Sequence, residues 1–254
     1  MIDYKQVVNE RYNKEKVIDS YKESNVYSLL NPVGFYTQQR INEVIRIFLK
    51  EVLLQTQKEI DNIKVLDAGC GKGGWTRGML DFIGNPNNLS GMEYSDNRIR
   101  HCRDMNPAIH YFEGDITKAI ISNEYFDGPY DGIVCADVLM HIRQKKDVLS
   151  ALKNMRDALE ENGILLWYDT LAKTHFDEYD SECQGFSEKE MDMFANECGL
   201  ELVKSMNFFK QISIGKHKFS TVYNINDNNK IFCRWIEKMP FGRSVVTCRL
   251  YKKV

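Results

Sequence analysis

The stretch VLDAGCGKGGW, residues 65–75, indicates how the chain is expected to fold. Its apolar start, followed by an acid and four glycines, predicts a buried strand, a tight turn and the beginning of a helix. Read literally, Gly69, Gly71 and Gly74 spell G-x-G-x-x-G, the fingerprint of a dinucleotide-binding turn. Asp67 lies two residues before the first glycine, where its carboxylate would repel an anionic pyrophosphate. The turn therefore predicts a ligand that accepts a carboxylate beside it.

From residue 63 onward, short apolar strands alternate with amphipathic helices. Helices are expected at 74–83, 96–105, 145–163 and 187–199, and strands at 63–68, 88–94, 109–116, 130–137, 164–170, 200–209 and 244–254. Such an alternation predicts an α/β fold, a doubly wound, Rossmann-like and mostly parallel sheet with helices on both faces.

Two segments flank this core. Residues 1–58 are predicted to form an N-terminal helical lid, with a helix that Thr37 caps after the aromatic loop 25–36. Residues 59–254 are expected to form the main domain, with an insertion over about 210–243, and both parts to make one structural unit.

Acidic residues stand at the carboxyl ends of the first five predicted strands. In open α/β sheets, ligands bind outside these ends, so the acids predict a polar-lined site there. They are Asp67, Glu93, Asp115, Asp137 and Asp169.

A ligand with ribose hydroxyls, an ammonium and a sulfonium suits this edge, because it welcomes negative charge and has no phosphate to repel. That ligand is S-adenosylmethionine, with S-adenosylhomocysteine as the product. Glu93 would accept hydrogen bonds from the ribose diol, and Asp115 one from the adenine amino group. The rival interpretation, an NAD(P)-dependent oxidoreductase, uses the same glycines and assigns Glu93 to the ribose of the dinucleotide.

The ordered motifs resemble those of class I S-adenosylmethionine-dependent methyltransferases over about residues 63–170. The motifs are VLDAGCGKGG, GMEYS, FEGDI, YDGIVCADVLMHI and LEENGILLWYDT. The terminal helix-strand-strand pattern agrees with the seven-stranded sheet of that fold, whose last strand is antiparallel. The stretches VYSLLNPVGFYTQQR and LLWYD also resemble a subgroup often encoded with bacterial surface-polysaccharide (capsule/O-antigen) genes.

The resemblance implies a set of cofactor-binding residues. Asp67, Gly69 and Gly71 would contact the methionine end, Glu93 the ribose, Asp115 and Ile116 the adenine, and the backbone near Ala136 would line the cavity. Arg40 is a further candidate for the cofactor carboxylate, through a bidentate pair, or else a solvated charge on its helix. The chain departs from many relatives at Lys72-Gly73-Gly74-Trp75, where they have Gly-Thr-Gly.

The catalytic candidates follow the fourth strand. His141 is a candidate general base because imidazole titrates near neutral pH, and Asp137 is a second candidate, or a cap of the following turn. Asp169 and His175 are expected to bind the substrate or to terminate the fifth strand. Tyr27 and Tyr36, in the aromatic loop, are expected to fold over the ligands. Asp137 and Asp169 would suit Mg²⁺, but no third ligand has a convincing spacing, so no metal is expected.

Composition narrows the functional classes. A net charge of −2 disfavours a protein that binds nucleic acid by neutralising many phosphates. No stretch reaches the length of an apolar membrane span, and no signal peptide is expected. Seven cysteines without a C-x-x-C pair predict reduced thiols in a cytoplasm.

The predicted protein is a methyltransferase that acts on a small molecule. The predicted acceptor is an oxygen of a sugar or nucleotide-linked sugar in surface-polysaccharide biosynthesis. One alternative is an N- or O-methyltransferase for a metabolite unrelated to glycans. Another is a non-catalytic domain that binds the nucleoside as a scaffold or sensor.

Overall fold

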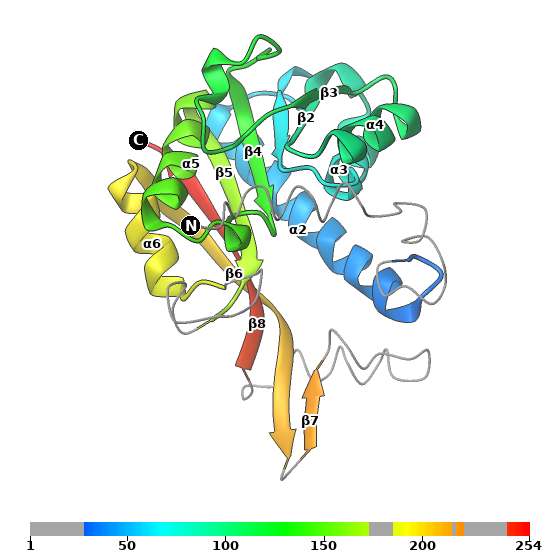
Figure 1. The fold of residues 1–254 in the computed structure, drawn as a ribbon, viewed down its shortest axis with the longest axis vertical. Helices are drawn as coiled ribbons and strands as arrows, with labels where there is room; N and C mark the ends of the chain where they lie inside the picture. The colour runs from blue at the N-terminus through cyan, green and yellow to red at the C-terminus, as the bar shows by residue number, and fades with distance from the viewer. Residues whose placement is uncertain (1–27, 173–184, 215–216, 221–242) are drawn as a thin grey trace.

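The computed structural model describes residues 28–172, 185–214, 217–220 and 243–254 (Figure 1). In this part of the chain an eight-stranded sheet has the order β3-β2-β1-β4-β5-β8-β6-β7. The strands are β1 (Val65–Ala68), β2 (Leu89–Glu93), β3 (His110–Glu113), β4 (Tyr130–Ala136), β5 (Leu159–Thr170), β6 (Leu200–Ile214), β7 (His217–Ser220) and β8 (Arg243–Lys253). The helices are α2 (Pro32–Thr56), α3 (Gly74–Ile83), α4 (Asp96–Met105), α5 (Lys145–Ala158) and α6 (Glu188–Glu197), with short 3₁₀ turns η2 (Ile60–Asn62), η3 (Pro86–Asn88), η4 (Ile120–Ser122) and η5 (Leu139–His141).

The predicted doubly wound fold is confirmed. Strands β1 to β5 pair in parallel, and β8 runs antiparallel between β5 and β6. Seven strands thus form the expected mostly parallel sheet with an antiparallel last strand. The eighth, β7, pairs antiparallel with the far end of β6 and extends the sheet beyond its body (Figure 1).

Helices cover both faces of the sheet. Figure 1 shows α2, α3 and α4 on one side and α5 and α6 on the other. Alternate residues of β5 pack into the hydrophobic cores on opposite faces of the sheet. Leu166 and Tyr168 face the α2 side, whereas Leu165 and Trp167 face the α5 side. This alternation places neighbouring side chains at the carboxyl end of β5 on opposite faces.

Helix α2 begins earlier than predicted. It starts at Pro32, because the Asn31 side chain accepts a hydrogen bond from Val33 N (2.9 Å) and proline suits the first helical position. The loop expected over 25–36 therefore ends at Asn31, and Thr37 lies inside the helix. The predicted lid and the insertion over 210–243 lie partly outside the described residues and stay predictions.

The helix before β5 is shorter than predicted. It ends at Ala158 instead of near Gly163, because Leu159 already pairs with Tyr130 of β4. Asn162, with a φ of 65°, lies in the left-handed region that glycine and asparagine favour. By contrast, the capping box of Ser187 and Glu190 at the start of α6 is confirmed.

Helix α2 packs on β4 at Gly132. A Cβ at this glycine would lie 2.6 Å from Phe48 Cζ and 3.0 Å from Val52 Cγ2, both in the buried core. We expect Gly132→Ala to lower the free energy of unfolding by about 1–3 kcal/mol, the usual cost of overpacking. Denaturant unfolding would measure it, with Gly74→Ala as the control, since an added methyl there would meet no atom within 4 Å beyond its chain neighbours and its own helix backbone. Parental stability of Gly132→Ala would contradict this account of the packing.

Candidate functional site

Three glycines shape the turn after β1, but not the three that the sequence pattern suggested. Gly69, Gly71 and Gly73 have φ values of 82°, 56° and 73°, in the region that favours glycine. Gly74 is the first residue of α3 and has ordinary helical backbone. The turn therefore follows a G-x-G-x-G pattern, and Gly73 replaces Gly74 as its third glycine.

The turn is held against the end of β2. Gly69 N and Cys70 N donate to the carbonyl oxygen of Met92, at 2.7 and 2.9 Å. Gly71 N donates to Glu93 Oε2 at 2.9 Å. The glycine turn and the acid predicted to bind the ribose therefore lie in direct contact.

Glu93 is buried at this contact, 7% exposed. Its other oxygen, Oε1, accepts from Tyr94 N (2.8 Å) and Ser95 N (2.9 Å). A carboxylate offers about four lone-pair positions, and three backbone donors use three of them. One acceptor position of Glu93 is left for a ligand hydroxyl.

Asp67 lies beneath the turn instead of facing a ligand. It is 1% exposed, and Thr76 Oγ1, at the start of α3, donates to its Oδ2 at 2.6 Å. Burial raises the pKa of Asp67 to about 7, helped by the negative charge of Glu93. The predicted repulsion between an Asp67 carboxylate and a pyrophosphate is accordingly weaker than the sequence suggested.

Asp137 follows β4 with a φ of 54°, which an aspartate tolerates better than most residues. Its N–H donates to Tyr168 O (2.8 Å), so it stays tied to β5. The residue is exposed, yet the protein packed around its carboxyl raises the pKa of Asp137 to about 7. A carboxyl that changes charge near neutral pH is suited to proton transfer.

The two halves of the site meet at Gly69 and Val138. A Cβ at Gly69 would lie 2.4 Å from Val138 Cγ2, so the glycine turn packs against the segment after β4. Ala136 ends β4 beside Tyr168 and is partly exposed. His141 ends the turn η5 and is partly buried, four residues after Asp137.

Asp169 has a position that differs from the prediction. It is 0% exposed and accepts three hydrogen bonds from the protein, so it lies behind the site and does not face an acceptor. Asp169 therefore binds protein N–H groups and not the substrate that was predicted for it.

Asp115 and Ile116 follow β3. Asp115 Oδ1 accepts from the N–H (2.9 Å) and the hydroxyl (2.8 Å) of Thr117, which makes a turn. Ile116 is buried, and its carbonyl accepts from Asn154 of α5. Both lie at the edge where an adenine was predicted, and that role stays a prediction.

The remaining predicted residues lie on α2 or outside the described part. Arg40 pairs with Glu43 and lies over the Phe208 ring, 4.8 Å from its centroid. Tyr36 is 1% exposed and packs edge-on against Phe209, so its ring belongs to the core and not to a solvent-exposed loop. Tyr27 and His175 lie outside the described residues.

Sequence reasoning missed Thr76, Val138 and Tyr168. Tyr168 packs edge-on against Trp75 of α3 (centroids 5.2 Å apart) and accepts the Asp137 N–H on its carbonyl. The available signals were a hydroxyl residue two positions into α3 and the tyrosine that precedes Asp169 in LLWYD. Neither residue type is specific enough to be chosen from the sequence alone.

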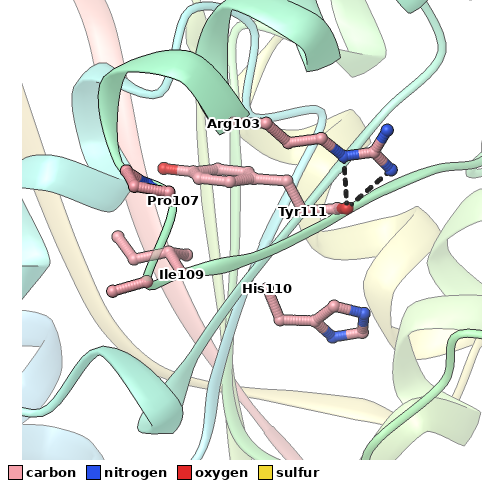
Figure 2. Close-up of a pocket in the computed structure, with 6 residues that line it drawn as sticks. Arg103, Pro107, Ile109, His110 and Tyr111 are labelled. Atoms are coloured by element: carbon pink, nitrogen blue, oxygen red, sulfur yellow. Dashed lines mark hydrogen bonds between the residues drawn. The ribbon is translucent and has the colours of Figure 1, made fainter.

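A surface pocket of about 440 Å³ lies elsewhere, at the connection from α4 to β3 (Figure 2). Arg103 there donates from Nε (3.1 Å) and Nη2 (2.9 Å) to Tyr111 O. Because it lies beside the amino end of β3, this pocket is remote from the strand ends that carry the candidate site.

Among the described residues, no group of three or more histidines, cysteines, aspartates or glutamates is placed to hold a metal ion. None of the described helices combines the length and apolar character that crossing a bilayer requires.

Comparison with known proteins bears on this geometry. Residues 65–163 match the methyltransferase domain family. The matched range contains the glycine turn, Glu93 and Asp137, which together form the site described above. Demethylmenaquinone methyltransferases from Staphylococcus epidermidis and Staphylococcus aureus are both 22% identical to this chain, over 59% and 66% of its length. The chain spans 58% and 66% of the length of these curated relatives.

Solved structures support the fold. The magnesium protoporphyrin IX methyltransferase of Synechocystis PCC 6803, determined with bound SAM, is similar with a TM-score of 0.63 and 13% identity over 100% of this chain and 99% of that one. A putative sarcosine dimethylglycine methyltransferase from Galdieria sulphuraria gives a TM-score of 0.57 and 17% identity, over 85% and 86%. The chain has the Rossmann-like fold of S-adenosylmethionine-dependent methyltransferases, as predicted.

Proposed function

We propose that the chain is an S-adenosylmethionine-dependent methyltransferase that acts on a small-molecule acceptor. The observation that carries the proposal is the contact between the glycine turn and Glu93, with one acceptor position left on a buried carboxylate. The match of residues 65–163 to the methyltransferase domain family supports it. When bound, the cofactor would supply an electrophilic methyl group.

The residues present fit this cofactor. Gly71 has no backbone atom near its missing side chain, only Arg98 Nη1 at 3.6 Å, so a ligand could approach the turn closely. Glu93, Asp115 and Asp137 lie at or beyond the carboxyl ends of β2, β3 and β4, where negative charge would complement the positive ammonium and sulfonium groups. We propose the ribose at Glu93, the methionine end at the glycine turn, and the adenine near Asp115 and Ile116.

The protein would promote the transfer by positioning the acceptor in line with the methyl group and by excluding water. If the acceptor is a hydroxyl, a base must take its proton, and we propose Asp137 for this task. The protein around its carboxyl raises the pKa of Asp137 to about 7, so the group is largely ionised above neutral pH. His141 is the second candidate for the same task.

For the acceptor we propose an oxygen of a sugar or nucleotide-linked sugar in surface-polysaccharide biosynthesis. The resemblance of VYSLLNPVGFYTQQR and LLWYD to enzymes of that setting supports it. A second candidate, a small metabolite unrelated to glycans, is favoured by relatives named for demethylmenaquinone and magnesium protoporphyrin IX. We also propose a cytoplasmic location, supported by buried free thiols at Cys70, Cys102, Cys135, Cys198 and Cys248.

A panel of acceptors tests the proposal. The purified chain would be incubated with S-adenosylmethionine and nucleotide-linked sugars, sugar phosphates, phenolic and quinol compounds, or amines, and S-adenosylhomocysteine would be measured. Turnover with a nucleotide-linked sugar is the expected result. Turnover with only another class would move the acceptor to that class, and no turnover with any class would contradict the proposed activity.

A further inference from the structure

We propose that Asp169 is a positioning residue: its buried carboxyl group fixes the segment 137–141, which carries both candidate bases, against the end of β5. The inference rests on the proposed function and deepens it. It concerns a side chain that does not contact the acceptor but acts through residues expected to do so.

One of the three hydrogen bonds of Asp169 crosses from β5 to the segment after β4, and the other two come from residues of β5 itself. Oδ2 accepts from Met140 N (3.1 Å), and Met140 is the middle residue of η5. The same oxygen accepts from Trp167 Nε1 (3.2 Å), and Oδ1 accepts from Thr170 N (3.1 Å). One side chain therefore ties the turn that ends at His141 to the strand end.

The segment needs such a tie because its backbone turns sharply. Asp137 has a φ of 54°, in the left-handed region that is less favourable for aspartate than for glycine, so contacts that hold it there matter. Its N–H is held by Tyr168 O, and Met140 N is held by Asp169, so both anchors come from β5. Moving either anchor would move the Asp137 carboxyl relative to the acceptor.

These donors use both oxygens of the Asp169 carboxyl as acceptors. In Asp169→Asn, one oxygen becomes an NH₂ group. Either that group faces the N–H groups of Met140 and Trp167, or it faces Thr170 N. The variant thus keeps the shape of the side chain and loses at least one of its bonds.

Titratable groups surround Asp169 on several elements. They are Cys135 on β4, Asp137 after it and Tyr168 on β5, with His141 one residue beyond Met140. Burial and the nearby Asp137 charge raise the pKa of Asp169 well above its usual range. The test therefore uses one fixed pH and does not depend on the charge of this carboxyl.

The test compares Asp169→Asn with the parent, using the acceptor found in the panel. We expect kcat to fall about 10–100-fold, the scale for a misplaced catalytic group, while the Kd for S-adenosylhomocysteine stays within about twofold. In the double variant with Asp137→Asn, the loss should not exceed that of Asp137→Asn alone, because both changes disable the same group. A parental kcat, or losses that multiply in the double variant, would overturn the inference.

Two controls separate positioning from general stability. Asp131→Asn removes another buried carboxylate, which accepts from Lys64 N (2.9 Å) at the amino end of β4, far from the candidate site. This variant should lower Tm without lowering kcat. Trp167→Phe removes one donor but keeps the bond to Met140, and should keep kcat within about threefold.

A larger loss in Trp167→Phe, or an Asp169→Asn chain that no longer binds S-adenosylhomocysteine, would assign Asp169 a general structural role. A parent without turnover would overturn the proposed function and this inference with it, whereas variants with parental kcat overturn this inference alone.

Discussion

Replacing Asp137 by Asn is expected to lower kcat by about 10²–10⁴, the usual contribution of a general base to the transfer from a hydroxyl. The amide keeps the size of the side chain but cannot accept the proton. Because Glu93 and the glycine turn are untouched, the Kd for S-adenosylhomocysteine should stay within about twofold. Steady-state rates and calorimetric titration would measure the two effects separately.

The pH profile gives the same prediction a second measurement. The protein packed around the carboxyl of Asp137 raises its pKa to about 7, and a base works in its ionised form. The parental rate should therefore rise with pH through about 7 and level off above it, and Asp137→Asn should lack this limb. If His141→Gln loses the limb and the rate while Asp137→Asn keeps both, the base is His141. Parental rates in both variants would contradict base catalysis by either residue.

Replacing Glu93 by Ala is expected to weaken cofactor binding by about 1.5–3 kcal/mol, or about 10–150-fold in Kd, the scale of hydrogen bonds to a charged group. The variant loses the ribose acceptor and the bond that orients Gly71 N. Turnover at saturating S-adenosylmethionine should change much less. Titration with S-adenosylhomocysteine would measure the change in Kd.

Glu113 offers a matched control, because it pairs with Glu93 in the register of β2 and β3 and its residue is exposed. Glu113→Ala removes a carboxylate from the same edge of the sheet and should leave the Kd within about twofold. Equal affinity for cofactor in Glu93→Ala and the parent would show that Glu93 does not bind the ribose.

Much of the fold could be predicted because its signals are local. The apolar strand VLDA, the glycines after it and the capping box at Ser187 each determine structure through neighbours in the chain. The start of α2 was predicted too late because Asn31-Pro32 was interpreted as a loop, although the same pair caps a helix well. The end of α5 was predicted too late because it depends on the pairing of Leu159 with Tyr130, a contact between distant residues.

The site was predictable as an edge of the sheet but not as a set of roles. Parallel strands bring their carboxyl ends together, so Glu93 and the glycine turn were placed side by side correctly. Depth was not predictable: the same pattern puts Asp67 and Asp169 in the interior and leaves Asp137 exposed. The direction in which each carboxyl points depends on its hydrogen-bond donors. Thr76 binds Asp67, and Met140 and Trp167 bind Asp169, and no sequence motif marks these donors.

The identity of the cofactor is the central claim, and calorimetric titration of the purified chain with S-adenosylhomocysteine, and separately with NAD and NADP, tests it most directly. The glycine turn, Glu93 and the family match predict saturable binding of S-adenosylhomocysteine and none of either dinucleotide. Tight binding of NAD or NADP, with no binding of S-adenosylhomocysteine, would contradict it.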